Sequence, residues 1–203
     1  MVSIIIPTLG RTEQCKKCIE RIYETMQGFL CEVIVITEDK ETQKALKGMC
    51  TLIEEGGTAV EKWNRGYAES IGSWVLLGAD DLWFDIEWYK VFLNNKNKGF
   101  VGFNDLANYT GNATHFMMSK DFINSVLDGQ FIYPEYKAWY FDLEICHRAR
   151  KAGRYLYLED CIVEHRHWNW NKSKKDKTYE LGQSRINSDK LLYEKRKQKL
   201  DID

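Results

Sequence analysis

Residues 73–81 read SWVLLGADD, and this stretch decides the fold class. Ser73 is followed by a short apolar run over 74–77, which is typical of a fully buried β-strand. After one glycine and one alanine, the run ends in two adjacent carboxylates, Asp80 and Asp81. An apolar strand that leads directly into paired acids predicts a sheet edge where polar groups gather.

The segments before this stretch alternate between strand and helix patterns. Apolar runs predict strands over 2–6, 33–36 and 52–53, and apolar residues at helical spacing predict helices over 12–27 and 59–71. Strands joined through helices are parallel and connected by right-handed crossovers. The sequence therefore predicts an α/β fold with a mostly parallel central sheet.

The carboxyl ends of these strands are polar. They are the segments 7–11, 37–39 and 78–81. Ligands of open parallel sheets bind beyond the carboxyl ends of the strands. We expect these three segments to lie on one edge and to form the binding site.

The remaining chain adds weaker patterns. We expect helices over 84–94 and 141–152, and strands over 100–103, 115–118, 155–158 and 162–164. The highly charged stretch 189–203 is expected to be an exposed helix or a mobile end.

Length and composition bound the class of protein. The chain has 203 residues, 44% of them apolar, and a formal net charge of -1, which fits one globular domain and argues against a generally basic nucleic-acid-binding protein. No apolar stretch approaches the roughly 18 residues that a membrane-spanning helix needs, and the N-terminus lacks the pattern of a signal peptide. We therefore expect a protein without a membrane span, located in the cytoplasm.

The adjacent acids Asp80 and Asp81 indicate a cation site. Two unit charges about 4 Å apart repel by roughly 4 kcal/mol at an effective dielectric constant of about 20. A divalent cation offsets this repulsion, and Mg²⁺ sites often combine one or two carboxylates with substrate phosphates. The alternative is a turn with exposed acids, or an N-cap of the next helix.

Four segments in order resemble family 2 glycosyltransferases of the GT-A fold. They are residues 2–11, 32–39, 64–81 and 141–153, and the likeness extends from about residue 2 to residue 168. The resemblance implies a single Rossmann-like GT-A domain over residues 1–170. Residues 171–203 then form a charged C-terminal loop and tail, packed on that domain or extending from it.

The resemblance also implies a donor site and a metal site. The donor is a nucleoside-diphosphate sugar, with UDP as the first choice, and the cation is Mn²⁺ or Mg²⁺. Gly78 replaces the first acid of the family's D-x-D motif, which leaves open whether Asp80 or Asp81 binds the metal. The implied donor contacts are Pro7, Thr8, Gly10, Arg11, Glu38, Asp39, Lys62, Asn64, Ala79 and Asp80; the implied metal ligands are Asp80, Asp81, His165 and His167.

The four histidines are not equivalent in the sequence. His165 and His167 come late in the chain, where GT-A enzymes often supply a metal ligand, and alternation on a strand would place both on one face. A structural role for either is the alternative. His115 and His147 carry no such signal and are interpreted as ordinary.

Asp142 is the predicted catalytic residue. It lies in the first turn of its predicted helix, near the position of the family's catalytic acid. Sugar transfer with inversion requires a carboxylate that accepts the acceptor hydroxyl proton. The alternative role is stabilisation of the helix start by a negative charge. Glu144 is instead expected to pair with Arg148 at i,i+4.

Two other functions stay open. A sugar nucleotidyltransferase would need a glycine-rich loop after the first strand, where only Gly10 is present. A non-catalytic nucleotide-sugar binder is compatible with the glycine in the metal motif. The acceptor is also open, nucleic acid included. The lysine-rich segment 172–177 is either a solvated loop or a flap that closes over the diphosphate.

Overall fold

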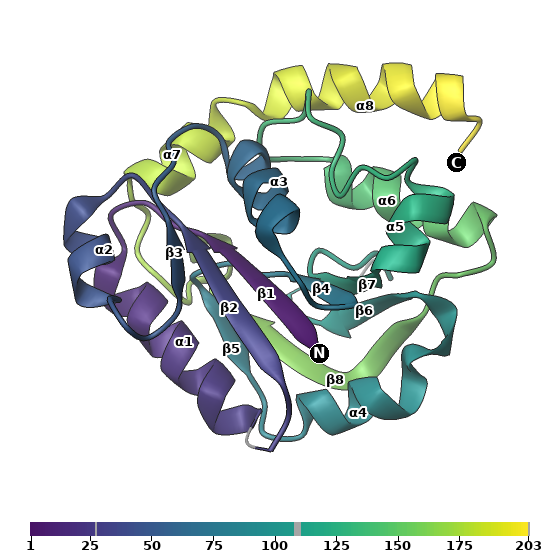
Figure 1. Ribbon diagram of the computed structural model, residues 1–203. Coiled ribbons are helices and arrows are strands. Elements are labelled where there is room, and N and C mark those ends of the chain that lie inside the picture. The colour runs from purple at the N-terminus through teal and green to yellow at the C-terminus, as the bar shows by residue number, and fades with distance from the viewer. Residues whose placement is uncertain (27, 108–110, 203) are drawn as a thin grey trace.

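The computed structural model describes residues 1–26, 28–107 and 111–202. One curled eight-stranded sheet forms its centre, with the strand order β3-β2-β1-β4-β7-β6-β8-β5 (Figure 1). The strands are β1 (Val2–Pro7), β2 (Cys31–Ile36), β3 (Thr51–Ile53), β4 (Trp74–Leu77), β5 (Leu82–Phe84), β6 (Phe100–Asn104), β7 (Phe116–Ser119) and β8 (Tyr157–His165).

The predicted parallel half of the sheet is confirmed. β1 pairs in parallel with both β2 and β4, and β2 pairs in parallel with β3. β1, β2 and β4 consist almost entirely of apolar residues, because helices cover both faces of this half. The other half is mixed, since β7 is antiparallel to β4 and β6, and β8 is parallel to β6 but antiparallel to β5.

Helices cover both faces of the sheet, as Figure 1 shows. Helices α1 and α4 pack on one face around a core that includes Ile4, Ile19 and Trp88. Helices α3, α5 and α6 pack on the other face around Ile5, Phe122 and Ile145. The helices are α1 (Thr12–Thr25), α2 (Lys40–Ala45), α3 (Ala59–Glu69), α4 (Trp88–Asn95), α5 (Lys120–Val126), α6 (Phe141–Lys151), α7 (Lys177–Gln183) and α8 (Ile186–Leu200), with short 3₁₀ turns at Lys96–Lys98 and Trp168–Trp170.

Two predicted segments differ from the structure. The helix expected over 84–94 begins only at Trp88, because residues 82–84 instead form β5 and pair with β8. The two strands expected over 155–158 and 162–164 are one strand, β8, whose pairing with β6 continues across a register shift after Phe103. In both cases a long-range pairing overrides the local pattern.

The charged C-terminal segment forms two helices that pack on the rest of the chain. The carboxylate of Glu144 on α6, which is 3% exposed, accepts two hydrogen bonds of 2.6 Å from Arg196 on α8. Asp189 on α8 accepts hydrogen bonds from the backbone N–H groups of residues 137–139. α8 therefore fixes the chain that leads into α6. Within the described ranges, no helix combines the length and apolarity that crossing a bilayer requires.

Candidate functional site

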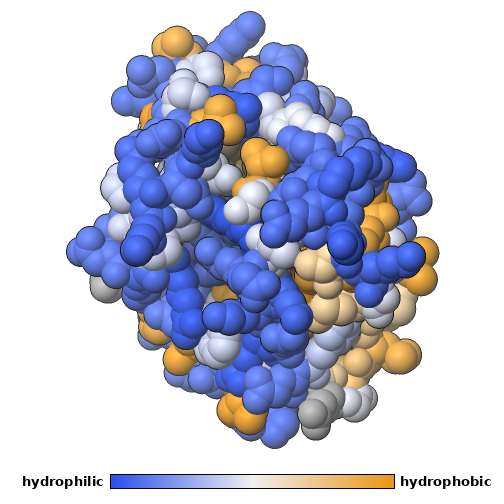
Figure 2. Space-filling view, turned by 90° about the vertical axis from the view of Figure 1, so that its left-hand side faces the viewer, coloured by the Kyte–Doolittle hydropathy of each residue, from blue (hydrophilic) through white to orange (hydrophobic). Residues whose placement is uncertain are grey.

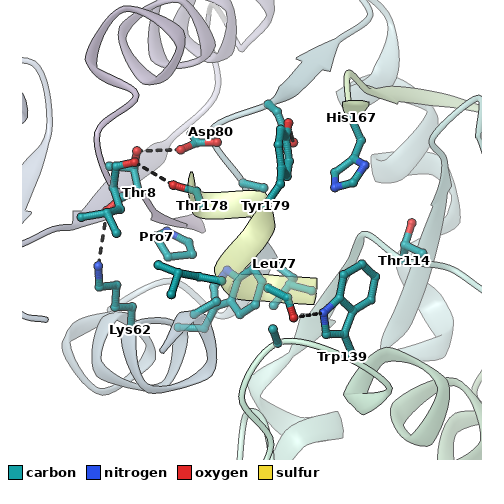
Figure 3. Close-up of a pocket in the computed structure, with 18 of the residues that line it drawn as sticks. Pro7, Thr8, Lys62, Leu77, Asp80, Thr114, Trp139, His167, Thr178 and Tyr179 are labelled. Atoms are coloured by element: carbon teal, nitrogen blue, oxygen red, sulfur yellow. Dashed lines mark hydrogen bonds between the residues drawn. The ribbon is translucent and has the colours of Figure 1, made fainter. Parts of the chain in front are cut away.

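The carboxyl ends of β1 and β4 open into one cavity of about 270 Å³ (Figure 3). Figure 2 looks onto this side of the molecule and shows a predominantly hydrophilic surface. The cavity brings together residues that lie far apart in the sequence. Among the predicted site residues, it is lined by Pro7, Thr8, Arg11, Lys62, Ala79, Asp80, Asp81, Asp142, His165 and His167.

Asp80 is buried and held by residues of the β1 loop. Its carboxylate accepts a hydrogen bond of 2.6 Å from the Thr8 hydroxyl and lies 3.0 Å from Nη1 of Arg11. Burial, reinforced by repulsion from Asp81, raises the pKa of Asp80 to about 6, although Arg11 and Thr8 oppose this shift. Asp80 is thus tied to the predicted nucleotide loop.

Asp81 points to the other side of the cavity. Its Oδ2 lies 3.3 Å from Nε2 of His165 and accepts a hydrogen bond of 2.9 Å from the Tyr179 hydroxyl. Burial alone would raise the pKa of Asp81, but the charge and hydrogen bond of His165, together with the charge of Arg11, outweigh it and hold the pKa below its ordinary value. The two adjacent acids therefore have different partners, and only Asp81 faces a histidine.

Packing explains why position 78, two residues before Asp80, holds a glycine. A Cβ atom at Gly78 would lie 2.7 Å from the backbone oxygen of Ile5 and 3.0 Å from a side-chain carbon of Ile6. The carbonyl of Gly78 also accepts a hydrogen bond of 2.8 Å from the Trp63 indole. No side chain fits there without displacement of β1, so a carboxylate at this position is incompatible with the close contact.

Asp142 lines the same cavity as the acid pair, from the first turn of α6. Burial raises the pKa of Asp142 to about 6, with a smaller contribution from the charge of Asp105. Tyr140, two residues before Asp142, adopts a left-handed backbone conformation with a φ of 65°. The loop before it is held by Asp189, so the start of α6 is fixed by the C-terminal helix.

The other predicted donor contacts fall into three groups. Lys62 is 3% exposed, forms an ion pair with Glu38, and lies 3.4 Å from the backbone oxygen of Thr8. Gly10 and Asp39 line a second cavity, and Arg11 lines both cavities. Asn64 is not brought to either site within the described part of the chain, because its amide pairs with the backbone of Ile132.

The segment that contains α7 lies across the cavity. Arg11 donates two hydrogen bonds to Asp176, of 2.7 and 2.8 Å, and its guanidinium stacks 3.8 Å from the centre of the Tyr179 ring. Thr178 donates to the backbone oxygen of Leu9, and Trp139 donates to that of Gly182 (Figure 3). Residues 172–176 form the loop that the sequence predicted. The helix that follows from Lys177 is hydrogen-bonded to both walls.

Comparison with solved structures identifies the fold. A mannosyltransferase from Pyrobaculum calidifontis in complex with GDP-Man and Mn²⁺ matches with a TM-score of 0.65 and 16% identity, over 82% of this chain and 57% of that one. Glucosyl-3-phosphoglycerate synthase from Mycobacterium tuberculosis with Mn²⁺ and UDP matches with a TM-score of 0.63 and 11% identity, over 82% of this chain and 72% of that one. The chain has the GT-A fold.

A third GT-A neighbour is TarS from S. aureus, with a TM-score of 0.56 and 17% identity over 80% of this chain and 59% of that one. This chain thus spans little more than half the length of two of the three GT-A proteins. Neither the family models nor the curated proteins that were compared with the sequence give a match.

The GT-A fold implies a divalent cation, and the side chains present fit one. His165 and Asp81 face each other, and His165 also belongs to a cluster with Asp105 and His115 whose three ligand atoms lie within 4.8 Å of one another. His167 is not part of this cluster. Its Nδ1 accepts a hydrogen bond from the backbone of Asn169, and its ring packs 4.3 Å from that of Tyr179.

The sequence did not point to Asp105, and His115, which was interpreted from the sequence as ordinary, is brought into the same cluster. His115 is 6% exposed and lines the cavity. Burial and the nearby charge of His165 lower the pKa of His115 to about 3, so its imidazole is neutral. The sequence feature that could have indicated Asp105 is its position directly after β6, since Asp80 and Asp81 likewise follow β4.

Proposed function

We propose that this chain transfers a sugar from a nucleoside-diphosphate sugar to an acceptor hydroxyl, with a divalent cation as cofactor. The observation that carries the proposal is the arrangement of acids around one cavity. Asp80 and Asp81 lie at the end of β4, and Asp142 lines the same cavity from α6. The GT-A neighbours whose structures contain Mn²⁺ with GDP-Man or UDP support this assignment.

We assign the cation to Asp81 and His165, because these side chains face each other at 3.3 Å. A bound divalent cation would stabilise the negative charge that develops on the leaving diphosphate. Asp80 remains bonded to Thr8 and Arg11, so its role is to hold the β1 loop beside the donor.

The donor is proposed to span the two cavities. The second cavity, beside Gly10 and Asp39, takes the base and ribose of the nucleotide. Arg11 lines both cavities and Lys62 lines the first. Two positively charged side chains therefore lie along the path that the diphosphate would take from one cavity to the other. UDP is the proposed nucleotide.

Asp142 is proposed as the general base of an inverting transfer. Its carboxylate takes the proton of the acceptor hydroxyl, the oxygen attacks the anomeric carbon, and the bond from that carbon to the diphosphate breaks. A base with a pKa near the working pH balances ionisation against basicity, and the pKa of about 6 for Asp142 fits this requirement. Trp139, which also lines the cavity, offers an aromatic face to the acceptor.

The Asp142→Asn variant tests the proposal. With Mn²⁺ and a panel of UDP- and GDP-sugars, wild-type protein is expected to release the nucleotide from one of them, slowly without acceptor and faster with one. The variant should bind that donor with unchanged affinity and turn it over at least about 100-fold more slowly, the usual scale for loss of a general base. Asp160→Asn, a change at an exposed acid on β8, is the matched control.

Two results would count against this function. Full turnover by Asp142→Asn would remove the base assignment. Donor binding by wild-type protein without turnover of any donor, in the presence of a broad panel of acceptors, would favour the non-catalytic nucleotide-sugar binder instead.

A further inference from the structure

A cluster of two histidines and one carboxylate adjoins the cavity next to Asp81. Asp105, His115 and His165 each offer a ligand atom, and these three atoms lie within 4.8 Å of one another. Asp105 is 2% exposed and His115 is 6% exposed. The rings of His115 and His165 meet edge to face, with 4.5 Å between their centres.

The fold holds these side chains at one edge of three neighbouring strands. Asp105 follows β6, His115 precedes β7, and His165 ends β8, and the sheet order is β7-β6-β8. The backbone N–H of His165 donates to the carbonyl of Asp105 at 3.0 Å, and that of Phe103 donates to the carbonyl of His115 at 3.1 Å. Backbone hydrogen bonds between neighbouring segments therefore hold the residues of the cluster in place.

The ring of His115 has an unsatisfied polar atom. The Nδ1 atom of His115 is buried, and the described residues provide no hydrogen-bond partner for it. A buried polar atom without a partner costs about 1–3 kcal/mol, so such atoms in folded proteins usually meet a water or an ion.

The carboxylate of Asp105 is oriented by its neighbours. Its Oδ2 accepts a hydrogen bond from the hydroxyl of Thr114, and its Oδ1 accepts one of 3.0 Å from the backbone N–H of Ala107. Outer partners of this kind fix the direction of a ligating side chain and are a regular part of metal sites.

We infer that Asp105 and His115 join His165, with Asp81 alongside, in a nitrogen-rich cation site that binds a divalent transition metal without nucleotide. Two imidazoles favour Mn²⁺, Co²⁺ or Zn²⁺ over Mg²⁺, which takes oxygen ligands almost alone. This inference rests on the proposed function in one respect: the cation bound here is the one that serves the nucleotide-sugar donor. It predicts that the site prefers Mn²⁺ to Mg²⁺.

Manganese alone is the probe for this site. Mn²⁺ is added to metal-free protein without nucleotide, bound ion is counted by electron paramagnetic resonance, and pulsed measurements detect the ¹⁴N couplings of ligating imidazoles. We expect one bound Mn²⁺ with couplings from two imidazoles, and no displacement by a large excess of Mg²⁺.

Three variants make the test specific. His115→Gln should remove one of the two imidazole couplings and weaken Mn²⁺ binding by at least about 10-fold. Asp105→Asn, which keeps the size of the side chain, should weaken binding on a similar scale and serves if His115→Gln does not fold. His147→Gln, on α6 beside Tyr193, should leave the bound Mn²⁺ unchanged.

The outcomes separate this inference from the proposed function. If both cluster variants bind Mn²⁺ as wild type does, with the same couplings, or if Mg²⁺ displaces Mn²⁺ readily, the inference is wrong while Asp81 and His165 can still serve a donor-bound cation. If the couplings are found but Asp142→Asn keeps full turnover, the metal site stands and the assignment of the base fails.

Discussion

Nε2 of His165 lies 3.3 Å from Oδ2 of Asp81. The contact follows from the register of two strands, because Leu82 on β5 pairs with His165 on β8. The backbone N–H of Arg166 also donates to the carbonyl of Asp81 at 2.9 Å. A short antiparallel pairing therefore brings the late histidine to the acid pair.

The activity should depend on the ionisation of Asp142. Burial raises the pKa of Asp142 to about 6, and a general base works only when it is deprotonated. We therefore expect kcat to fall as the pH drops below about 6 and to level off above it. A pH profile of donor turnover measures this. An acidic limb centred near the ordinary aspartate value, about 4, would contradict the assigned environment.

Gly78 should tolerate no side chain. In Gly78→Ala the added carbon would meet the backbone oxygen of Ile5 at 2.7 Å, so β1 must shift. We expect the free energy of unfolding to fall by about 1–3 kcal/mol, as for other overpacked cores, measured by urea denaturation. The matched control is Gly56→Ala, whose new carbon has its nearest neighbour at 3.7 Å. Equal stability of the two variants would show that the contact is not restrictive.

Asp189 should stabilise the loop that leads into α6. It is 1% exposed and accepts hydrogen bonds of 2.8 Å from the backbone N–H groups of Ala138 and Trp139. In Asp189→Asn the negative charge that strengthens these bonds is lost, and the NH₂ group that replaces one oxygen cannot accept a hydrogen bond from the backbone. We expect a loss of about 1–3 kcal/mol in the free energy of unfolding, measured by chemical denaturation.

The exposed Asp160→Asn is the control for this change and should stay within about 0.5 kcal/mol of wild type. If both variants unfolded at the same denaturant concentration, α8 would not fix the loop.

The sequence predicted the parallel half of the sheet because each strand and helix in that half has a clear pattern in its own residues. The runs at β1, β2 and β4 are continuous and apolar, and the segments between them either repeat at helical spacing or end in polar residues. The acids at the end of β4 and Asp142 on α6 were found for the same reason. Each one follows directly after a local pattern or within it.

The rest of the site depends on long-range pairing. Asp105 and His115 meet His165 only because β7, β6 and β8 lie side by side. A lone histidine before a strand carries no local signal, so it was interpreted as structural. Glu144 shows the same limit. Its predicted partner Arg148 lies 3.7 Å away, but Arg196 from the C-terminal helix makes the two shorter contacts.

Calorimetric titration of UDP and GDP, with and without Mn²⁺, tests most directly whether the acids after β4 hold a cation for a nucleoside diphosphate. For wild-type protein we predict that Mn²⁺ strengthens the binding of one of these nucleotides by at least about 10-fold, the range of typical coupling between two ligands. In Asp81→Asn this strengthening should vanish, while Asp160→Asn keeps it. Nucleotide binding that is indifferent to Mn²⁺ in wild type, or an unchanged Mn²⁺ effect in Asp81→Asn, would contradict the account.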